Sequence, residues 1–164
     1  LRNKKALEKL ATLKDVKLKK SNFSIICHDL SNLSEYVKHI DRPTFKLLKN
    51  SLPGPFTFIM NATQEVTKIF DSNKKEIGIR IPDNNIILEI VKKLGNPIAT
   101  TSLHNDEDQI LDYFTDPYTI FENYDDKVDL IIDGGAGKLE ASTVVDCTDG
   151  SPEIIRQGIG IIEL

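Results

Sequence analysis

Apolar residues recur along this chain at two spacings, one of three to four residues and one of two. The wider spacing is typical of amphipathic helices, which we expect over 3–13, 31–40, 42–52, 83–95 and 115–124. The shorter spacing and short apolar runs indicate strands, which we expect over 24–27, 56–62, 76–82, 97–102, 128–133, 142–147 and 153–158. Such a mixture predicts a single α/β (α+β) domain, 1–164.

Residues at the helix ends support this pattern. Asn3, Ser31 and Asp83 are predicted N-caps, because their side chains can accept hydrogen bonds from the first free backbone N–H groups. Pro117 suits the first turn of the last helix, where no backbone donor is needed. The Pro-Gly-Pro segment at 53–55 would end the third helix before a strand begins.

The run of small residues from Ala99 to Ser102 is unusual for a strand. A buried strand would continue with large apolar side chains, whereas small hydroxyl residues leave room for a ligand and can bind it. A strand end that leads into a solvated loop would look the same. The run by itself leaves both interpretations open.

Length and composition fit a globular protein. The chain has 164 residues, of which 40% are hydrophobic, enough to bury one core. No apolar run approaches a membrane span, and no secretory leader is visible, so we expect a cytoplasmic protein with no membrane partner. Because Leu1 opens directly in a helical pattern, we also expect that an N-terminal piece is missing. The two cysteines, Cys27 and Cys147, lie in apolar runs and are predicted to be buried, reduced thiols rather than zinc ligands.

Charge is unevenly distributed. Residues 1–20 carry eight basic and two acidic residues, a local charge of +6. Because the whole chain has a net charge of −4, the remaining residues carry −10. A basic cluster of this kind can bind phosphates by counterion release, although it can equally be the solvated face of a helix.

Several familiar motifs are absent. The Gly-rich segment 134–138 lacks Walker spacing and precedes a predicted strand, so it favours a tight turn over a phosphate loop. The histidines His28, His39 and His104 have no metal-binding spacing, so no protein-bound metal is predicted, and no Gly-x-Ser-x-Gly elbow exists. Polar residues do interrupt apolar strands at Arg80, Ser102, 142–143 and Arg156. An arginine between isoleucines must reach solvent or an anion. These residues alone therefore fit both the solvated face of a sheet and a polar cleft for an anionic ligand.

The same positions carry a resemblance to a known family. The segments LPGPFTFIM, IGIRIPDN, PIATTSLH, VDLIIDGG, STVVDCT and PEIIRQGIG resemble, in order and spacing, successive landmarks of the YrdC family, closest to its YciO branch. This implies a YrdC-like twisted mixed β-sheet with surrounding helices and a large central cleft. It also implies threonylcarbamoyl-AMP synthase chemistry, in which ATP, L-threonine and bicarbonate give threonylcarbamoyl-AMP and pyrophosphate for tRNA modification. Some members bind double-stranded RNA or tRNA.

Site residues follow from the resemblance position by position. Threonine would be bound by Arg80, Thr100 and Ser142, and the nucleotide by Lys14, Asn22, Ser102 and Arg156. ATP would serve as a substrate together with Mg²⁺. No general base is implied, so catalysis would come from positioning and from cationic groups beside the reacting phosphate.

Three departures from the family pattern bear on activity. Val16 replaces an arginine that follows Lys14 by two positions, and His104 replaces an asparagine. The early family histidine falls at Cys27, with His28 displaced by one residue. The alternative is therefore a YciO-like paralogue that binds nucleotide or RNA without efficient synthesis. A carbamoyl-transfer enzyme is a third alternative, which the short chain and the lack of zinc-finger cysteines disfavour.

Overall fold

The structure is a computed structural model that describes residues 1–71, 73, 75–103 and 115–164. Contacts divide the chain into a first unit, Leu1–Thr101 with Ser142–Leu164, and a second unit, Ser102–Ala141. The predicted single domain stays a prediction. His104 lies outside the described residues.

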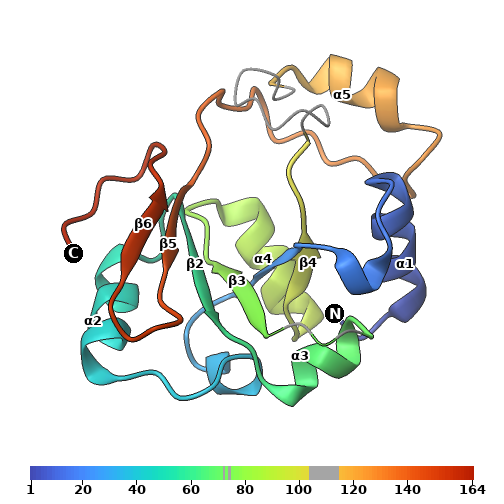
Figure 1. Ribbon diagram of the computed structural model, residues 1–164. Helices are drawn as coiled ribbons and strands as arrows, with labels where there is room; N and C mark the ends of the chain where they lie inside the picture. Colours follow the sequence, from blue (N-terminus) through green and yellow to red (C-terminus); the bar gives the residue numbers. More distant parts are fainter. Residues whose placement is uncertain (72, 74, 104–114) are drawn as a thin grey trace. The chain divides into compact units, whose positions relative to one another are not determined.

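The first unit is built on a six-stranded mixed sheet (Figure 1). Its strands are β1 (Ser24–Ile26), β2 (Phe56–Asn61), β3 (Glu76–Arg80), β4 (Ile98–Thr100), β5 (Thr143–Asp146) and β6 (Glu153–Arg156). Their spatial order is β4-β1-β3-β2-β5-β6. The pairs β1–β3 and β2–β5 are parallel, and the other neighbours are antiparallel. The predicted mixture of helices and strands is confirmed.

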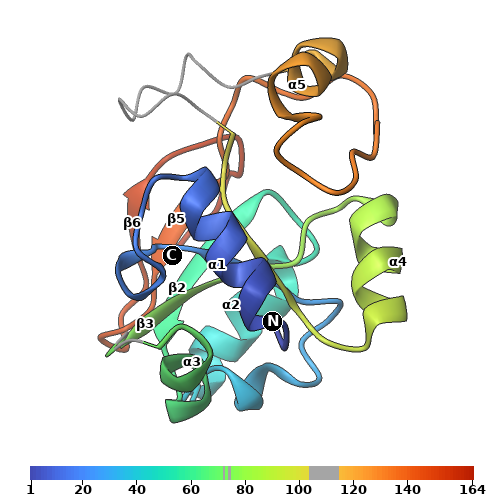
Figure 2. The same cartoon turned by 90° about the vertical axis from the view of Figure 1, so that its right-hand side faces the viewer.

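Five α-helices accompany the strands in the described part of the chain (Figures 1 and 2). They are α1 (Lys4–Leu13), α2 (Arg42–Ser51), α3 (Gln64–Ile69), α4 (Asn85–Leu94) and, in the second unit, α5 (Pro117–Tyr124). Asn3 caps α1, and Pro117 lies in the first turn of α5, as predicted. Helix α4 is capped by Asn84 rather than by Asp83, because the Asn84 side chain accepts from the Ile87 N–H. No helix in the described ranges is long and apolar enough to cross a membrane.

The predicted helix over 31–40 is wrong. Only Leu33–Glu35 forms a short 3₁₀ turn (η2), and the chain then pairs with the end of β2. Val37 bridges Ala62, the Lys38 N–H donates to the Asn61 carbonyl at 2.8 Å, and the Thr63 N–H donates to the Tyr36 carbonyl at 2.9 Å. The backbone N–H and C=O groups that would have bonded to one another within a helix here bond to the end of β2 and the residues after it.

The predicted strand over 128–133 is also wrong. Val128 to Asp133 runs in the second unit without strand pairing to any described residue, and Leu130 is 75% exposed. Alternating apolar residues suit a strand only when a neighbouring strand accepts their backbone hydrogen bonds. In contrast, α3 forms where the sequence pattern predicted no helix.

One row of apolar residues crosses the whole sheet and forms its buried face. Cross-strand pairing joins Ala99, Ile25, Ile79, Phe58, Val145 and Ile154 in that order. Four of these side chains, Ile25, Ile79, Phe58 and Val145, have no exposed surface. Leu7 and Ala11 of α1, Leu48 of α2 and Val66 of α3 belong to the same core. Because side chains alternate along a strand, the neighbouring positions must face the opposite side.

Candidate functional site

The opposite side of the sheet carries the polar residues that interrupt the strands, and we call it the polar face: Ser24, Thr57, Gly78, Arg80, Thr100, Ser142 and Arg156. Thr100 pairs with Ser24, which pairs with Gly78. In the adjoining row Arg80 pairs with Ile26. The pairing of β5 with β6 shifts register between Val144 and Val145, so Arg156, two residues after Ile154, pairs with Val144, which pairs with Thr57. Extending the β2–β3 register by one residue places Arg80 opposite Thr57.

Four of the seven predicted site residues therefore share one face. Arg80, Thr100, Ser142 and Arg156 lie on different strands or strand ends, and all are half-buried. Strands are about 4.8 Å apart, so the three steps from β3 to β6 separate Arg80 and Arg156 by roughly 14 Å at their Cα atoms. An amino acid is too short to bridge that distance, whereas an amino acid joined to a nucleotide can span it.

Arg156 is held by the residue that precedes β5. Its Nη2 donates to the Ser142 carbonyl at 2.9 Å and to Ser142 Oγ at 3.4 Å, and its Nε donates to the same carbonyl at 3.3 Å. Among described residues Nη1 donates no hydrogen bond, so this edge of the guanidinium is left for another acceptor. Ser142 Oγ also lies 3.0 Å from Thr57 Oγ1.

Ser142 and Thr143, which the sequence grouped together, face opposite ways. Thr143 is fully buried on the core side, where its hydroxyl donates to the Gly160 carbonyl at 2.6 Å and accepts from the Gly158 N–H at 3.0 Å. Its role is to fix the C-terminal segment, and only Ser142 contributes to the polar face.

Thr100 supplies a buried hydroxyl without a partner. Its Oγ1 is inaccessible and makes no hydrogen bond to a described residue. A buried hydroxyl of this kind costs free energy until a partner satisfies it. This agrees with the ligand interpretation of the small-residue run, although the run's contact with a ligand remains a prediction.

The other three predicted residues lie elsewhere. Lys14 forms the C-cap of α1 and is half-buried, and Asn22 is exposed just before β1. Ser102 belongs to the second unit. The roles of these three in nucleotide binding remain predictions. Val16, which replaces the family arginine, is 40% exposed, so no cation stands at that position.

Sequence reasoning missed three members of the polar face, Ser24, Thr57 and Gly78. A Cβ on Gly78 would overlap Ser24 Oγ and come 3.1 Å from Thr57 Cγ2, so glycine is what lets these two side chains approach each other. The available signal was the alternation around Phe58, which places Thr57 away from the core. Without the strand order, however, nothing indicates that Thr57 meets Ser142.

Both cysteines are buried and free, as predicted. Burial raises the pKa of the Cys27 thiol to about 12, and a neighbouring Asp29 charge adds to this. Burial likewise raises the pKa of Cys147 to about 11, with a smaller contribution from Asp146. Both groups are therefore protonated and unreactive at neutral pH.

A separate cavity of about 200 Å³ lies beyond the end of β1. Cys27, His28, Asp29, Tyr36 and Pro97 are among its lining residues. His28 Nδ1 is buried and makes no hydrogen bond to a described residue. Hydrogen bonds from Ser31 lower the pKa of Asp29. None of the predicted site residues lines this cavity.

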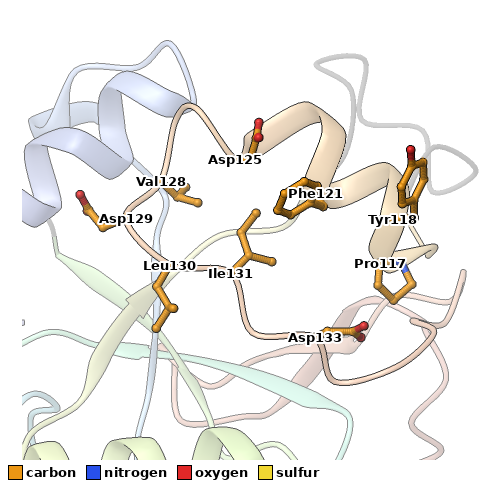
Figure 3. A pocket seen from close by; sticks show the side chains of 9 residues that line it. All are labelled: Pro117, Tyr118, Phe121, Asp125, Val128, Asp129, Leu130, Ile131 and Asp133. Atoms are coloured by element: carbon orange, nitrogen blue, oxygen red, sulfur yellow. The ribbon is translucent and has the colours of Figure 1, made fainter.

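The second unit has a groove of its own, of about 510 Å³ (Figure 3). Phe121 of α5 and Ile131 point toward one another across it, and Asp125 and Asp133 lie at its edge. The second unit holds 2 basic and 11 acidic residues, a charge of −9, which leaves 19 basic and 14 acidic residues, or +5, in the first unit. The polar face therefore belongs to a cationic unit of an anionic chain, which favours an anionic ligand there.

Comparison with known proteins finds one family model and several relatives. The family model for Sua5, YciO and YrdC proteins, described as "Telomere recombination", matches residues 1–158. An uncharacterized protein of Haemophilus influenzae is 41% identical over 140 residues, 85% of this chain and 67% of its own length. YciO of Escherichia coli K12 is 35% identical over 164 residues, 99% of this chain and 78% of its own length. Threonylcarbamoyl-AMP synthase of Pyrococcus abyssi is 27% identical over 127 residues, 77% of this chain but only 36% of that protein.

Solved structures agree with the fold. The crystal structure of E. coli YciO superposes with a TM-score of 0.83 at 34% identity, covering 98% of this chain and 76% of that one. The structure of P. abyssi Sua5 complexed with L-threonine gives a TM-score of 0.75 at 24% identity, covering 93% and 46%. The second likeness is one of fold alone. The expected YrdC-like α/β fold is confirmed by the first.

Proposed function

The chain belongs to the Sua5/YciO/YrdC family, and on that premise we propose that its polar face binds L-threonine and ATP for synthesis of threonylcarbamoyl-AMP. Bicarbonate is the third substrate and pyrophosphate the second product. The activated threonylcarbamoyl group would then serve tRNA modification. A distant relative from P. abyssi carries the name of this synthase, and the Sua5 structure from that organism holds L-threonine.

The observation that carries the proposal is the placement of Arg80 and Arg156 on one face of the sheet, opposite the core, with hydroxyl groups between them. A planar guanidinium can bind a carboxylate through two parallel hydrogen bonds, which suits Arg80 to the threonine carboxylate. Arg156, fixed by Ser142, presents its Nη1 edge to the nucleotide. Ser142 offers its hydroxyl group to the ligand that joins the two.

Rate enhancement at this face would come from positioning and from positive charge. Holding threonine, bicarbonate and ATP together replaces a rare collision among separate molecules by a reaction within one complex. A guanidinium beside the α-phosphate stabilises the charge that builds there as pyrophosphate leaves. Mg²⁺ would arrive with ATP, since no group of three His, Cys, Asp or Glu side chains in the described ranges could hold a metal.

The test is calorimetric titration of the protein at its full natural length with L-threonine, ATP and both together. Arg80→Ala should weaken threonine binding at least tenfold, because the carboxylate loses a charge-assisted pair of hydrogen bonds. Arg42→Ala is the matched control, since Arg42 is an exposed arginine at the start of α2, away from the polar face. Threonine binding that is equal in both variants would refute the assignment of Arg80. Pyrophosphate release should then require threonine, bicarbonate and ATP together.

A second candidate function is binding of nucleotide or RNA without synthesis, as in the YciO-like alternative. The structure adds an observation in its favour: Lys19 and Lys20 of the turn η1 (Leu18–Lys20) line one hollow of about 470 Å³ together with Lys68 of α3. Lysines from two segments that converge in this way can bind a phosphate backbone, with an affinity that falls steeply as salt rises.

Charge reversal distinguishes this candidate from the first. Lys19→Glu, Lys20→Glu and Lys68→Glu together should abolish RNA binding and leave threonine binding unchanged. The same reversal at three exposed lysines elsewhere, Lys46, Lys49 and Lys93, is the control. Equal losses in both triple variants would show that RNA responds only to net charge. ATP or RNA binding without any threonine binding would favour this candidate over the synthase.

A further inference from the structure

We propose that Thr57 is a positioning residue, which orients Arg156 through Ser142. Thr57 lies on β2, Ser142 immediately precedes β5, and Arg156 ends β6, so the three side chains connect three neighbouring strands. Neither the sequence pattern nor the resemblance assigned any role to Thr57. The inference rests on the proposed function only where it concerns nucleotide affinity.

The direction of the hydrogen bonds follows from the chemistry of the groups. A guanidinium has donors only, so Ser142 must accept from Arg156, mainly through its carbonyl at 2.9 Å and more weakly through Oγ at 3.4 Å. The Ser142 hydroxyl keeps its hydrogen and a second lone pair for Thr57 Oγ1, which lies 3.0 Å away, so either oxygen can donate in that bond. Thr57 thereby fixes the side chain of the residue on which Arg156 rests.

Packing fixes Thr57 in turn. Its side chain is 8% exposed, and its methyl group lies over Gly78, where a Cβ would come within 3.1 Å of it. A β-branched side chain has few staggered orientations, so the methyl contact also sets the direction of the hydroxyl. The methyl group of Thr57 thus packs against β3, and its hydroxyl group bonds to Ser142 beside β5.

The consequence lies in the edge of Arg156 that a ligand would meet. Two donors of Arg156 are committed to Ser142, and Nη1 is left to bind an acceptor. If the Ser142 side chain can rotate, the guanidinium loses its contact with Ser142 Oγ and is oriented by the Ser142 carbonyl alone. A ligand that binds Nη1 then has to order a less restrained guanidinium.

Two variants distinguish the effect of the Thr57 hydroxyl group from that of its methyl group. Thr57→Val keeps the shape and the methyl contact but removes the hydroxyl, whereas Thr57→Ser keeps the hydroxyl and removes a methyl group. The first readout needs no ligand: hydrogen exchange of the Arg156 side-chain Nε–H, observed by NMR and assigned by its loss in Arg156→Lys. We expect exchange at least fivefold faster in Thr57→Val and a smaller increase in Thr57→Ser, which keeps the hydroxyl but loses the methyl contact that directs it. Unchanged exchange in Thr57→Val would overturn the proposal.

The second readout is ATP affinity measured by calorimetry. Thr57→Val should weaken ATP binding about fivefold, the equivalent of one hydrogen bond, with the thermal midpoint close to that of Thr57→Ser. In an Arg156→Lys background Thr57→Val should cause no further loss, because both act through the same guanidinium. Losses that add fully would show that Thr57 acts independently of Arg156. A wild-type protein that does not bind ATP would refute the proposed function, while the exchange measurement would still decide the role of Thr57.

Discussion

The two faces of the sheet are built from the same six strands but carry different kinds of side chain. On one face Ile25, Ile79, Phe58 and Val145 form a continuous apolar row with no exposed surface. On the other lie Ser24, Thr57, Gly78 and Arg80, each one residue away along its strand, and Arg156, which a shift in register between β5 and β6 brings to this face. Stability therefore depends mainly on the first face, and binding can be built on the second without disturbing the core.

The largest effect expected from this difference is on stability. Phe58→Ala should lower the free energy of unfolding by about 3–5 kcal/mol, because a fully buried ring is replaced by a cavity. Ile59→Ala, at the adjacent half-buried position of β2, should cost less than half as much. Denaturant unfolding of both variants measures the two losses. Equal losses would show that the second face is as tightly packed as the first.

A smaller effect is expected where the polar face has the least room. Gly78→Ala should destabilise the protein by about 1–3 kcal/mol, because the new Cβ overlaps Ser24 Oγ and crowds Thr57 Cγ2. Adding Ser24→Ala removes the overlapping oxygen and should restore part of the loss. Thermal unfolding of the single and double variants gives the comparison. If the double variant is no more stable than Gly78→Ala alone, the overlap with Ser24 Oγ is not the cause of the lost stability.

The smallest effect concerns pH and the thiol of Cys27. Burial raises the pKa of this thiol to about 12, above the value of 9.0 in an exposed cysteine. The unfolded chain therefore loses its proton first, and the folded state loses stability between pH 9 and 12, while below pH 9 the stability is fully present. The loss between pH 8 and 10 should be about 1 kcal/mol.

Denaturant unfolding at pH 8 and pH 10 of wild type and Cys27→Ala tests this contribution. All other groups cancel in the difference between the two proteins, so the variant should lose less stability on going to pH 10. The same pH dependence in both would mean that the Cys27 thiol is solvated in the folded protein.

Much of the secondary structure could be predicted because its signals are local. The stripe and cap of α1, the first-turn proline of α5 and the apolar alternation of β2 and β3 act within a few residues. The failures occurred where the outcome depended on a distant partner, either present or missing. Backbone groups of 36–38 pair with the end of β2 instead of forming a helix, and 128–133 has strand-like residues but no strand beside it among the described residues.

For the candidate site, the sequence by itself determined which residues are chemically out of place in a strand: Arg80, Ser142 and Arg156. The period of two places Arg80 away from the core, but it would place Arg156 on the same side as Ile154. The shift in register between β5 and β6 is what brings Arg156 to the polar face. The tertiary structure alone decided that β3, β2, β5 and β6 are neighbours, and hence that Arg80, Thr57, Ser142 and Arg156 lie on one surface. Side-chain alternation is a property of each strand, whereas strand order depends on contacts between segments up to about a hundred residues apart.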